Sequence, residues 1–254
     1  MDKPKLQITA KQTEILSLLY RFRFLTRKQI QTILNHKNHR RIFSWLNELK
    51  DNDYLNYSYT KNFDNLPAIY SLGKNGVKYL RKEGIINGKA DRVRKEQKCS
   101  SRFKENCLLI GDIYLSLLKL PEAKIHFYTK TDLSGMKHLI SPHPDANFAV
   151  ESKTGIKRYF LEVFNENLRT NILRHRVKAY LTYYESDDWQ DNTDKPFPEI
   201  ILICPTVKLK NHLYYYIREK LDEDDHPNFY LTTKEQIISL GLTRETLEKI
   251  EPKD

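Results

Sequence analysis

Two acidic side chains are spaced in a way that suits metal-dependent chemistry. Asp145 follows Pro144 at the start of a β-prone segment, and Glu162 lies on the next such segment, after a turn at residues 152–155. Two carboxylates on neighbouring strands can hold Mg²⁺, because this cation prefers oxygen ligands and keeps several waters. A bound Mg²⁺ could activate a water for phosphodiester cleavage. Asp145 and Glu162 are therefore the candidate catalytic and metal-binding residues. No cofactor is expected unless this site is active, and Mg²⁺ is expected if it is.

The same two residues also have a structural interpretation. Asp145 could cap a turn, and Glu162 could pair with Arg158 on its own strand. The basic residues of the following helix could run along a DNA backbone, or form a solvated face that alternates with apolar residues. A core that binds without cutting is favoured over a working nuclease. The basic residues in question are Arg169, Arg174, Arg176 and Lys178, and the apolar ones are Ile172, Leu173, Val177 and Leu181.

Other metal and redox chemistry has little support in the sequence. Cys99, Cys107 and Cys204 form no CxxC pair and cannot close into an even set, which disfavours a disulfide framework and a cysteine-built zinc site. His36 and His39 lie three residues apart without further ligands, so they are better interpreted as surface or recognition-helix histidines.

The elements that must position Asp145 and Glu162 follow an α/β pattern. Their order, α-β-β-β-α-β-α-β, predicts a domain with a mixed sheet. The strand over 199–204 is almost continuously apolar, which is typical of a central strand. Thr233 and Gln236 form a capping box near the C-terminus. The expected helices cover 105–119, 168–184 and 209–221, and the expected strands cover 124–128, 146–150, 158–164, 199–204 and 229–232.

The N-terminal part of the chain has the pattern of a winged helix. Capping boxes at Thr9 with Gln12 and at Thr26 with Gln29 each precede an apolar run. Asn38 is expected to cap a third helix whose apolar residues form one buried stripe. Strands at 54–59 and 68–72 and a helix at 73–82 follow. Three helices, a β-hairpin and a closing helix make up a winged helix, a helix-turn-helix variant.

The third helix would present a small, basic outer face to a DNA major groove, which is wide enough to admit a helix. Its arginines could reach phosphates or guanine edges, and its polar residues could form hydrogen bonds with bases. Basic residues at the start of the second helix would hold phosphate oxygens, and a lysine in the wing turn could reach a flanking groove. The candidate DNA-binding residues are Arg27, Lys28, His39, Arg40, Arg41, Ser44, Asn47 and Lys61.

Charge is distributed unevenly along the chain. The formal net charge is +10, but residues 1–98 carry 21 Lys and Arg against 9 Asp and Glu, whereas the rest carries 22 against 24. The whole positive surplus therefore lies in and just after the winged-helix pattern, which indicates a polyanionic partner there. The alternative is a winged helix that binds protein, with its basic residues merely solvated. Double-stranded DNA is the favoured partner.

We expect two domains. Residues 1–86 would form a winged-helix DNA-binding domain, 87–104 a polar linker and 105–254 the α/β domain. No stretch approaches the ~18 consecutive apolar residues of a membrane-spanning helix, and the first residues lack the apolar region of a signal peptide. A cytoplasmic protein without a membrane partner is expected.

The C-terminal pattern resembles the PD-(D/E)XK restriction-endonuclease-like core. The resemblance rests on the helix, the strand that begins at Pro144-Asp145, the hairpin strand with Glu162, the next helix and the apolar strand. The motif of that core requires a lysine two residues after the glutamate, and here that position holds Phe164, which cannot balance charge or orient a water. The resemblance leaves Glu105 to stand in for an acid on the first helix, and Lys178 for a relocated lysine.

The whole chain resembles the replication-relaxation family of plasmid- and phage-borne proteins. The resemblance implies an α/β fold (α+β overall), with an N-terminal winged helix-turn-helix domain and a C-terminal restriction-endonuclease-like mixed-sheet domain. The motifs that carry it are Thr26-Arg27-Lys28-Gln29-Ile30, Arg40-Arg41, Ile69-Tyr70-Ser71-Leu72-Gly73 with Gly76, Pro144-Asp145, Leu161-Glu162-Val163 and Phe229-Tyr230-Leu231-Thr232-Thr233.

This family is associated with control of plasmid replication and copy number. The resemblance therefore implies a sequence-specific duplex-DNA-binding protein of a plasmid or other mobile element, which regulates its replication or transcription. Two alternatives remain open. One is a Mg²⁺-dependent DNA endonuclease or nickase that uses Asp145 and Glu162, and the other is an adaptor that recruits replication proteins. A homodimer is compatible with each of these functions.

Overall fold

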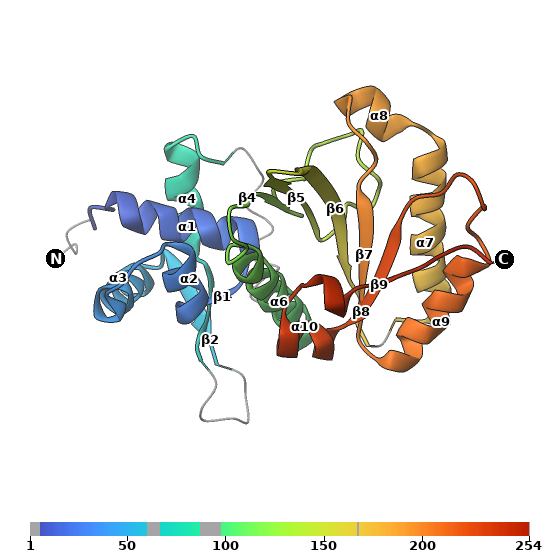
Figure 1. The fold of residues 1–254 in the computed structure, drawn as a ribbon. Coiled ribbons are helices and arrows are strands. Elements are labelled where there is room, and N and C mark those ends of the chain that lie inside the picture. Colours follow the sequence, from blue (N-terminus) through green and yellow to red (C-terminus); the bar gives the residue numbers. More distant parts are fainter. Residues whose placement is uncertain (1–5, 60–66, 87–97, 167, 254) are drawn as a thin grey trace. The chain divides into compact units, whose positions relative to one another are not determined.

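A computed structural model describes residues 6–59, 67–86, 98–166 and 168–253. The chain divides into two compact units, Met1–Gly111 and Asp112–Asp254 (Figure 1). Helix α6 (Ser101–Leu117) crosses this division and begins earlier than the predicted start at 105. Residues 87–97 of the predicted linker lie outside the described residues. The predicted domain limits at 86 and 105 therefore stay a prediction.

The first unit has the predicted winged-helix order of elements. Thr9 and Thr26 form the two predicted capping boxes, and Asn38 accepts a hydrogen bond from the backbone N–H of Arg41. The unit also contains a short strand, β1, that was not predicted. The elements are α1 (Ala10–Phe22), β1 (Leu25–Thr26), α2 (Arg27–Ile33), α3 (His39–Asp51), β2 (Leu55–Ser58), β3 (Ile69–Leu72) and α4 (Lys74–Lys82).

Strand β3 lies at the centre of a small antiparallel sheet, between β1 and β2. Two glycines let α4 approach the turn that leads into β2. A Cβ atom added at Gly73 would lie 2.4 Å from the carbonyl oxygen of Asp53, and one added at Gly76 would lie 2.4 Å from that of Tyr54. No side chain fits at either distance, so these two positions need glycine.

The first turns of α6 pack against the winged helix within the same unit. The rings of Phe24 and Phe103 meet edge to face, with their centroids 6.1 Å apart. Cys107 is buried with Phe24 and Ile69. The side-chain nitrogen of Gln29 donates a hydrogen bond to the carbonyl oxygen of Leu108, 2.8 Å away. The start of α6 is thus a structural part of the first unit.

The second unit is built on a mixed six-stranded sheet, in the order β4-β5-β6-β7-β8-β9. β4, β5 and β6 are antiparallel neighbours, and β6, β7 and β8 run parallel. The described elements are β4 (Lys124–Thr129), β5 (Ala146–Ser152), β6 (Gly155–Val163), α7 (Thr170–Glu185), α8 (Asp188–Thr193), β7 (Glu199–Cys204), α9 (Val207–Arg218), β8 (Phe229–Thr233), α10 (Lys234–Leu240), the 3-10 turn η1 (Arg244–Thr246) and β9 (Glu248–Lys249).

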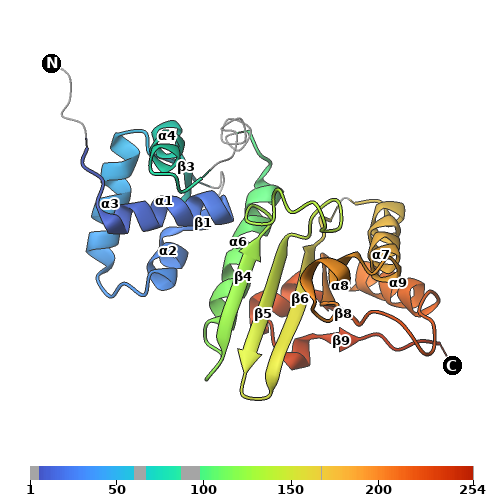
Figure 2. The ribbon, with the colours of Figure 1, turned by 90° about the horizontal axis from the view of Figure 1, so that it is seen from above.

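Helices α7 and α9 cover one face of this sheet (Figure 2). The core on that face combines alternate residues of β6, β7 and β8 with the inner sides of both helices, and Phe160, Leu202 and Tyr180 are almost fully buried. On the other face, the ring of Tyr114 in α6 lies 5.0 Å from that of Phe127 in β4. These elements and strand directions confirm the predicted fold class.

Two features of the second unit differ from the prediction. Helix α8 was not predicted: Asp187 is its N-cap, Asp188 is its first residue, and its Trp189 is buried against the core. Ile172 was expected to face inward, yet its side chain is 48% exposed. Within the described part of the chain, no helix is both long and apolar enough to cross a membrane.

Candidate nucleic-acid interface and nuclease-like site

Helix α3 has one apolar side and one polar side, as its sequence predicts. Ile42, Leu46 and Leu49 are fully buried and Trp45 nearly so. Since a residue's place on a helix is fixed by the 3.6-residue period, burying this stripe turns His39, Arg40 and Arg41 outward, and all three are exposed. The structure therefore presents the predicted arginine pair to solvent at the start of α3.

The two arginines have different surroundings. The guanidinium of Arg41 lies 5.3 Å from the ring centroid of Trp45, a cation–π arrangement. The ring of His36 contacts the same tryptophan edge to face at 5.1 Å. No carboxylate of the described residues pairs with Arg40 or Arg41. Both guanidinium groups therefore keep hydrogen-bond donors available for a phosphate or a base edge.

Ser44 is less available than the sequence suggests. Its hydroxyl donates a hydrogen bond to Glu48, 2.9 Å away, and the other carboxylate oxygen of Glu48 accepts one from Gln12 of α1. Ser44 and Asn47 are both half-buried. Of the candidate residues on α3, His39, Arg40 and Arg41 are the most accessible.

The second helix contributes basic residues at its start. Lys28 is exposed, and Arg27 is half-buried and donates a hydrogen bond to Gln31, 3.3 Å away. Neither α2 nor α3 has an acidic residue in its first turn. The positive ends of both helix dipoles therefore add to the charge of the arginines and Lys28. Lys61, the predicted wing contact, lies outside the described residues.

Asp145 lies just before β5, next to the end of β6. One carboxylate oxygen accepts a hydrogen bond from the backbone N–H of Val163 at 2.9 Å, and the other lies 3.3 Å from the ammonium nitrogen of Lys130. Asp145 also donates its own N–H to the carbonyl of Leu161. Asp145 therefore ties the start of β5 to the end of β6, a structural role that differs from the turn cap considered from the sequence.

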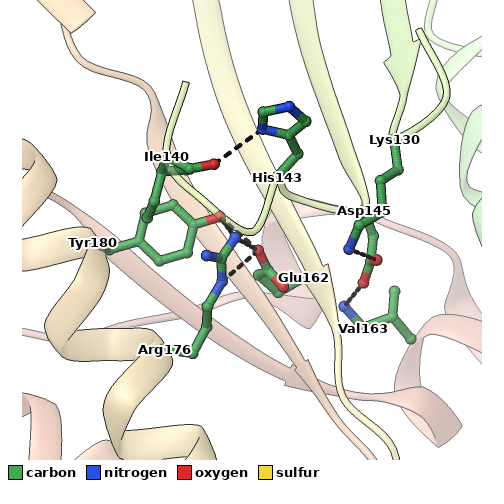
Figure 3. A network of polar contacts seen from close by, with 8 residues as sticks. All are labelled: Lys130, Ile140, His143, Asp145, Glu162, Val163, Arg176 and Tyr180. Carbon is green, nitrogen blue, oxygen red and sulfur yellow. Dashed lines mark hydrogen bonds and ion pairs between the residues drawn. The ribbon is translucent and has the colours of Figure 1, made fainter. Parts of the chain in front are cut away.

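Glu162 projects from β6 into the core beneath α7. It lies on the same sheet face as Phe160 and Phe164, and its side chain is only 9% exposed. One of its oxygens accepts hydrogen bonds from Nε of Arg176 at 2.9 Å, from a second nitrogen of the same guanidinium, and from the hydroxyl of Tyr180 at 2.7 Å. Figure 3 shows the Glu162 carboxylate directed at these two α7 side chains.

The partners predicted for this site are wrong. Arg158 stands opposite Ala149 on β5, and Glu162 pairs with Arg176 instead. Arg176 does not belong to a solvated face, because its side chain is 8% exposed. Lys178 points to solvent, so it is not a lysine relocated to the carboxylates. The sequence showed that α7 is basic, but only the packing of α7 over β6 shows which cation turns inward.

The electrostatics of Glu162 follow from its burial. Burial raises the pKa of its carboxyl group, the charge of Arg176 opposes this rise, and the charge of Asp145 adds to it. The hydroxyl of Tyr180 is fully buried against Glu162, and burial raises its pKa well above the ordinary value. Tyr180 therefore acts as a neutral hydrogen-bond donor, and Arg176 is the cation of the site.

The arrangement does not suit a divalent metal ion. Phe164 is buried in the core, so no lysine stands two residues after Glu162. Among the residues that the structure describes, no three His, Cys, Asp or Glu side chains come together to hold a metal. Glu105, considered as a third acid, is exposed near the start of α6. Catalytic and metal-binding roles for Asp145 and Glu162 stay predictions.

Comparisons with solved structures give weak likenesses. ZitR of Lactococcus lactis, described as a zinc-responsive MarR family member, is 17% identical over 46% of this chain and 77% of its own, with a TM-score of 0.28. ZitR in complex with DNA gives 20% identity, the same coverage and the same score. The restriction endonuclease FokI is 11% identical over 93% of this chain and 45% of its own, with a TM-score of 0.33. At these values, nothing about activity follows from either neighbour.

The comparison with protein families is decisive. No curated protein matches the chain. A family model described as Replication-relaxation, however, matches residues 16–200. The match covers the winged helix, α6, the strand that follows Asp145, the Glu162 strand and α7. The predicted resemblance is confirmed: this chain belongs to the replication-relaxation family.

Proposed function

We propose that this chain binds duplex DNA through the exposed face of α3 and the start of α2. The supporting observation is the arginine pair at residues 40 and 41, which is exposed and lacks a carboxylate partner in the described chain. Phosphate groups are the ligands that such a surface attracts, because guanidinium groups and helix starts both favour anions. Lys28 and Arg27 would hold phosphates beside the groove that α3 enters.

The biological role proposed with this activity is control of replication or transcription of a plasmid or other mobile element. Family membership supports this role. Sequence-specific recognition would come from side chains that reach base edges, with the exposed Arg40 and Arg41 the best placed and the half-buried Asn47 a further candidate. The role is compatible with a cytoplasmic protein, with a homodimer on a two-fold DNA site, and with replication proteins as further partners.

We propose that the second unit is not a nuclease. The Mg²⁺-dependent endonuclease remains the alternative, but one oxygen of Glu162 already accepts three hydrogen bonds. The test is incubation of supercoiled plasmid and linear duplex with the protein and Mg²⁺ or Mn²⁺. We expect no cleavage. Nicking that Asp145→Asn and Glu162→Gln both abolish would establish the alternative instead.

The DNA-binding proposal is tested by the salt dependence of binding to a labelled duplex. Each phosphate contact contributes about 0.9 to the slope of log K against log salt. Arg40→Ala combined with Arg41→Ala should therefore lower the slope by about 1.8 if both side chains contact phosphates. The matched control is Lys195→Ala with Arg244→Ala, which removes two exposed cations from the second unit. If neither the slope nor the affinity changes in the first variant, the proposed surface is contradicted; a loss of affinity at an unchanged slope would mean that the arginines contact bases rather than phosphates.

Selection of binding sites from a random duplex pool then tests specificity. The wild-type protein should enrich one sequence, and the arginine-pair variant should enrich it less or not at all. If Asn47→Ala changes the preferred base at one position while the salt slope stays the same, Asn47 contacts a base rather than a phosphate. Enrichment of no sequence by the wild-type protein would leave a DNA-binding protein without sequence specificity, contrary to the proposal.

A further inference from the structure

The resemblance of the second unit to the PD-(D/E)XK core implies a metal ion between Asp145 and Glu162, and the residues around them can be tested for that ion. In Figure 3 the two carboxylates are turned toward different partners: Glu162 toward Arg176 and Tyr180, and Asp145 toward Lys130 and Val163. A divalent cation shared by both residues would need oxygens that face a common point. The observed contacts instead engage each carboxylate separately.

A fixed positive charge already lies beside Glu162. Nε of Arg176 donates to a carboxylate oxygen of Glu162 at 2.9 Å, and another nitrogen of the guanidinium donates to the same oxygen. Tyr180 donates to that oxygen and also accepts a hydrogen bond from Arg176 at 3.2 Å. A divalent cation at this oxygen would have to displace three donors and would be repelled by the guanidinium.

The two carboxylates nevertheless require a cation. Glu162 is buried, and both its burial and the negative charge of Asp145 disfavour the ionised form of its carboxyl group by raising its pKa. A buried carboxylate that stays charged must be paired. Lys130 is half-exposed, and its ammonium nitrogen lies 3.3 Å from Asp145. Of the described cations, Arg176 is the one that contacts Glu162 directly, and Arg176 is itself buried.

The guanidinium of Arg176 has a further contact that suits a charged group. Its Nη1 is buried and has no hydrogen-bond partner among the described residues. Its guanidinium is also 4.6 Å from the ring centroid of Tyr180, a contact that favours a cation.

We infer that the Arg176 guanidinium is the resident cation of the Asp145–Glu162 site, in the place that the fold gives to a divalent metal ion. The wild-type chain then takes no Mg²⁺ or Mn²⁺ at these carboxylates. Asp145 keeps Lys130 as its partner, so removal of Arg176 leaves Glu162 without its cation and frees the Glu162 carboxylate for a divalent cation. This inference deepens the proposal of a non-catalytic second unit.

The test is titration of the full chain with MnCl₂. Isothermal calorimetry measures the heat of binding, and the thermal unfolding temperature is measured with and without Mn²⁺. In wild-type protein we expect no saturable binding heat that is lost when Glu162 is replaced. Arg176→Ala should bind one Mn²⁺ in the millimolar range, at least about tenfold more tightly than wild type, because the repelling charge is gone. Adding Glu162→Gln to Arg176→Ala should abolish this binding. The matched control is Arg174→Ala, an exposed arginine of the same helix.

Arg176→Ala removes one partner of a buried ion pair, so its folding is measured together with its Mn²⁺ binding. If Arg176→Ala does not fold alone, Mn²⁺ should restore cooperative unfolding, and Arg176→Gln repeats the titration with a neutral side chain that can still contact Glu162. The inference is overturned if wild-type protein binds Mn²⁺ through Glu162. It is also overturned if both variants neither bind Mn²⁺ nor gain stability from it. DNA binding by wild type is measured separately, so failure here leaves the proposed DNA surface intact.

Discussion

Arginines on two helices of this protein have opposite surroundings. On α3 of the first unit, Arg40 and Arg41 are exposed and have no acidic partner in the described chain. On α7 of the second unit, Arg176 is 8% exposed and forms hydrogen bonds to a buried glutamate. The first pair can therefore bind a partner outside the chain, whereas Arg176 is already committed to one within it.

A basic helix therefore cannot be assigned to DNA binding by its composition alone. Arg174 and Arg176 lie two residues apart on α7, yet one is exposed and the other is buried. What separates them is Glu162 on β6, which lies beneath one side of the helix only. Variants at Arg176, at Tyr180 and at the α3 arginine pair test this contrast.

The largest effect is expected from Arg176→Ala. Removal of one partner of a buried ion pair leaves the other charged and unpaired, which costs about 3–5 kcal/mol of the free energy of unfolding. Denaturant unfolding followed by circular dichroism measures it, with Arg174→Ala as the control. A loss below about 1 kcal/mol would mean that the Glu162–Arg176 pair contributes no more than a surface ion pair.

Replacement of both partners sharpens this prediction. In Glu162→Leu with Arg176→Met no unpaired charge is left, and a buried pair replaced by apolar residues is often neutral in stability. The double variant should therefore be more stable than Arg176→Ala alone. If it is equally unstable, lost packing explains the single variant and the charge argument does not.

The second prediction concerns a thiol in the interior of the second unit. Burial raises the pKa of Cys204 from 9.0 to about 12, so its thiolate fraction at pH 8 falls about a thousandfold. A thiol reagent should not modify Cys204 in the native protein, and it should modify Cys204 in the urea-unfolded protein. Because the folded pKa is the higher one, the associated stability is present below pH 9 and is lost as the pH rises toward 12. The Cys204→Ala variant is the control that shows whether the thiol that reacts after unfolding is Cys204.

The third prediction is a smaller loss from Tyr180→Phe. The substitution keeps the ring and removes one hydroxyl, which donates to Glu162 at 2.7 Å. Hydrogen bonds to charged groups contribute about 1.5–3 kcal/mol, so a loss in this range is expected in denaturant unfolding. Tyr215→Phe is the control, since Tyr215 is 64% exposed. Equal stability of both variants would remove Tyr180 from the network.

The smallest effect on stability is expected where the effect on DNA binding is largest. Arg40→Ala with Arg41→Ala should change the free energy of unfolding by about 0.5 kcal/mol or less, because both side chains are exposed. The sign should be toward greater stability at low salt, since cations at a helix start oppose its dipole. A loss above about 1 kcal/mol would indicate that these arginines pack inside the protein.

Local patterns in the sequence predicted most of the fold. The capping boxes at Thr9, Thr26 and Thr233 form as expected, because each depends on residues within one helical turn. The helical spacing of apolar residues in α3 correctly predicted that Arg40 and Arg41 are exposed, because the buried stripe fixes which side of the helix faces solvent. These features need no knowledge of distant parts of the chain.

Features that depend on distant contacts were missed. Strand β1 has two residues and forms only because β3 pairs with it. Lys130 reaches Asp145 across 15 residues, and Arg176 reaches Glu162 across 14. No spacing rule connects such pairs. A signal was present only in Tyr180, which follows Arg176 by one helical turn and so had to face the same strand.

The helix starts of the first unit have a consequence for how the protein responds to its medium. α1, α2, α3 and α4 all begin without an acidic residue in their first turn. No acidic side chain in these first turns offsets the positive ends of the helix dipoles. Salt screens the repulsion between these positive ends and the neighbouring basic side chains. Added salt should raise the melting temperature of the free protein while it weakens binding to a polyanion. Heat resistance and affinity would then move in opposite directions with ionic strength.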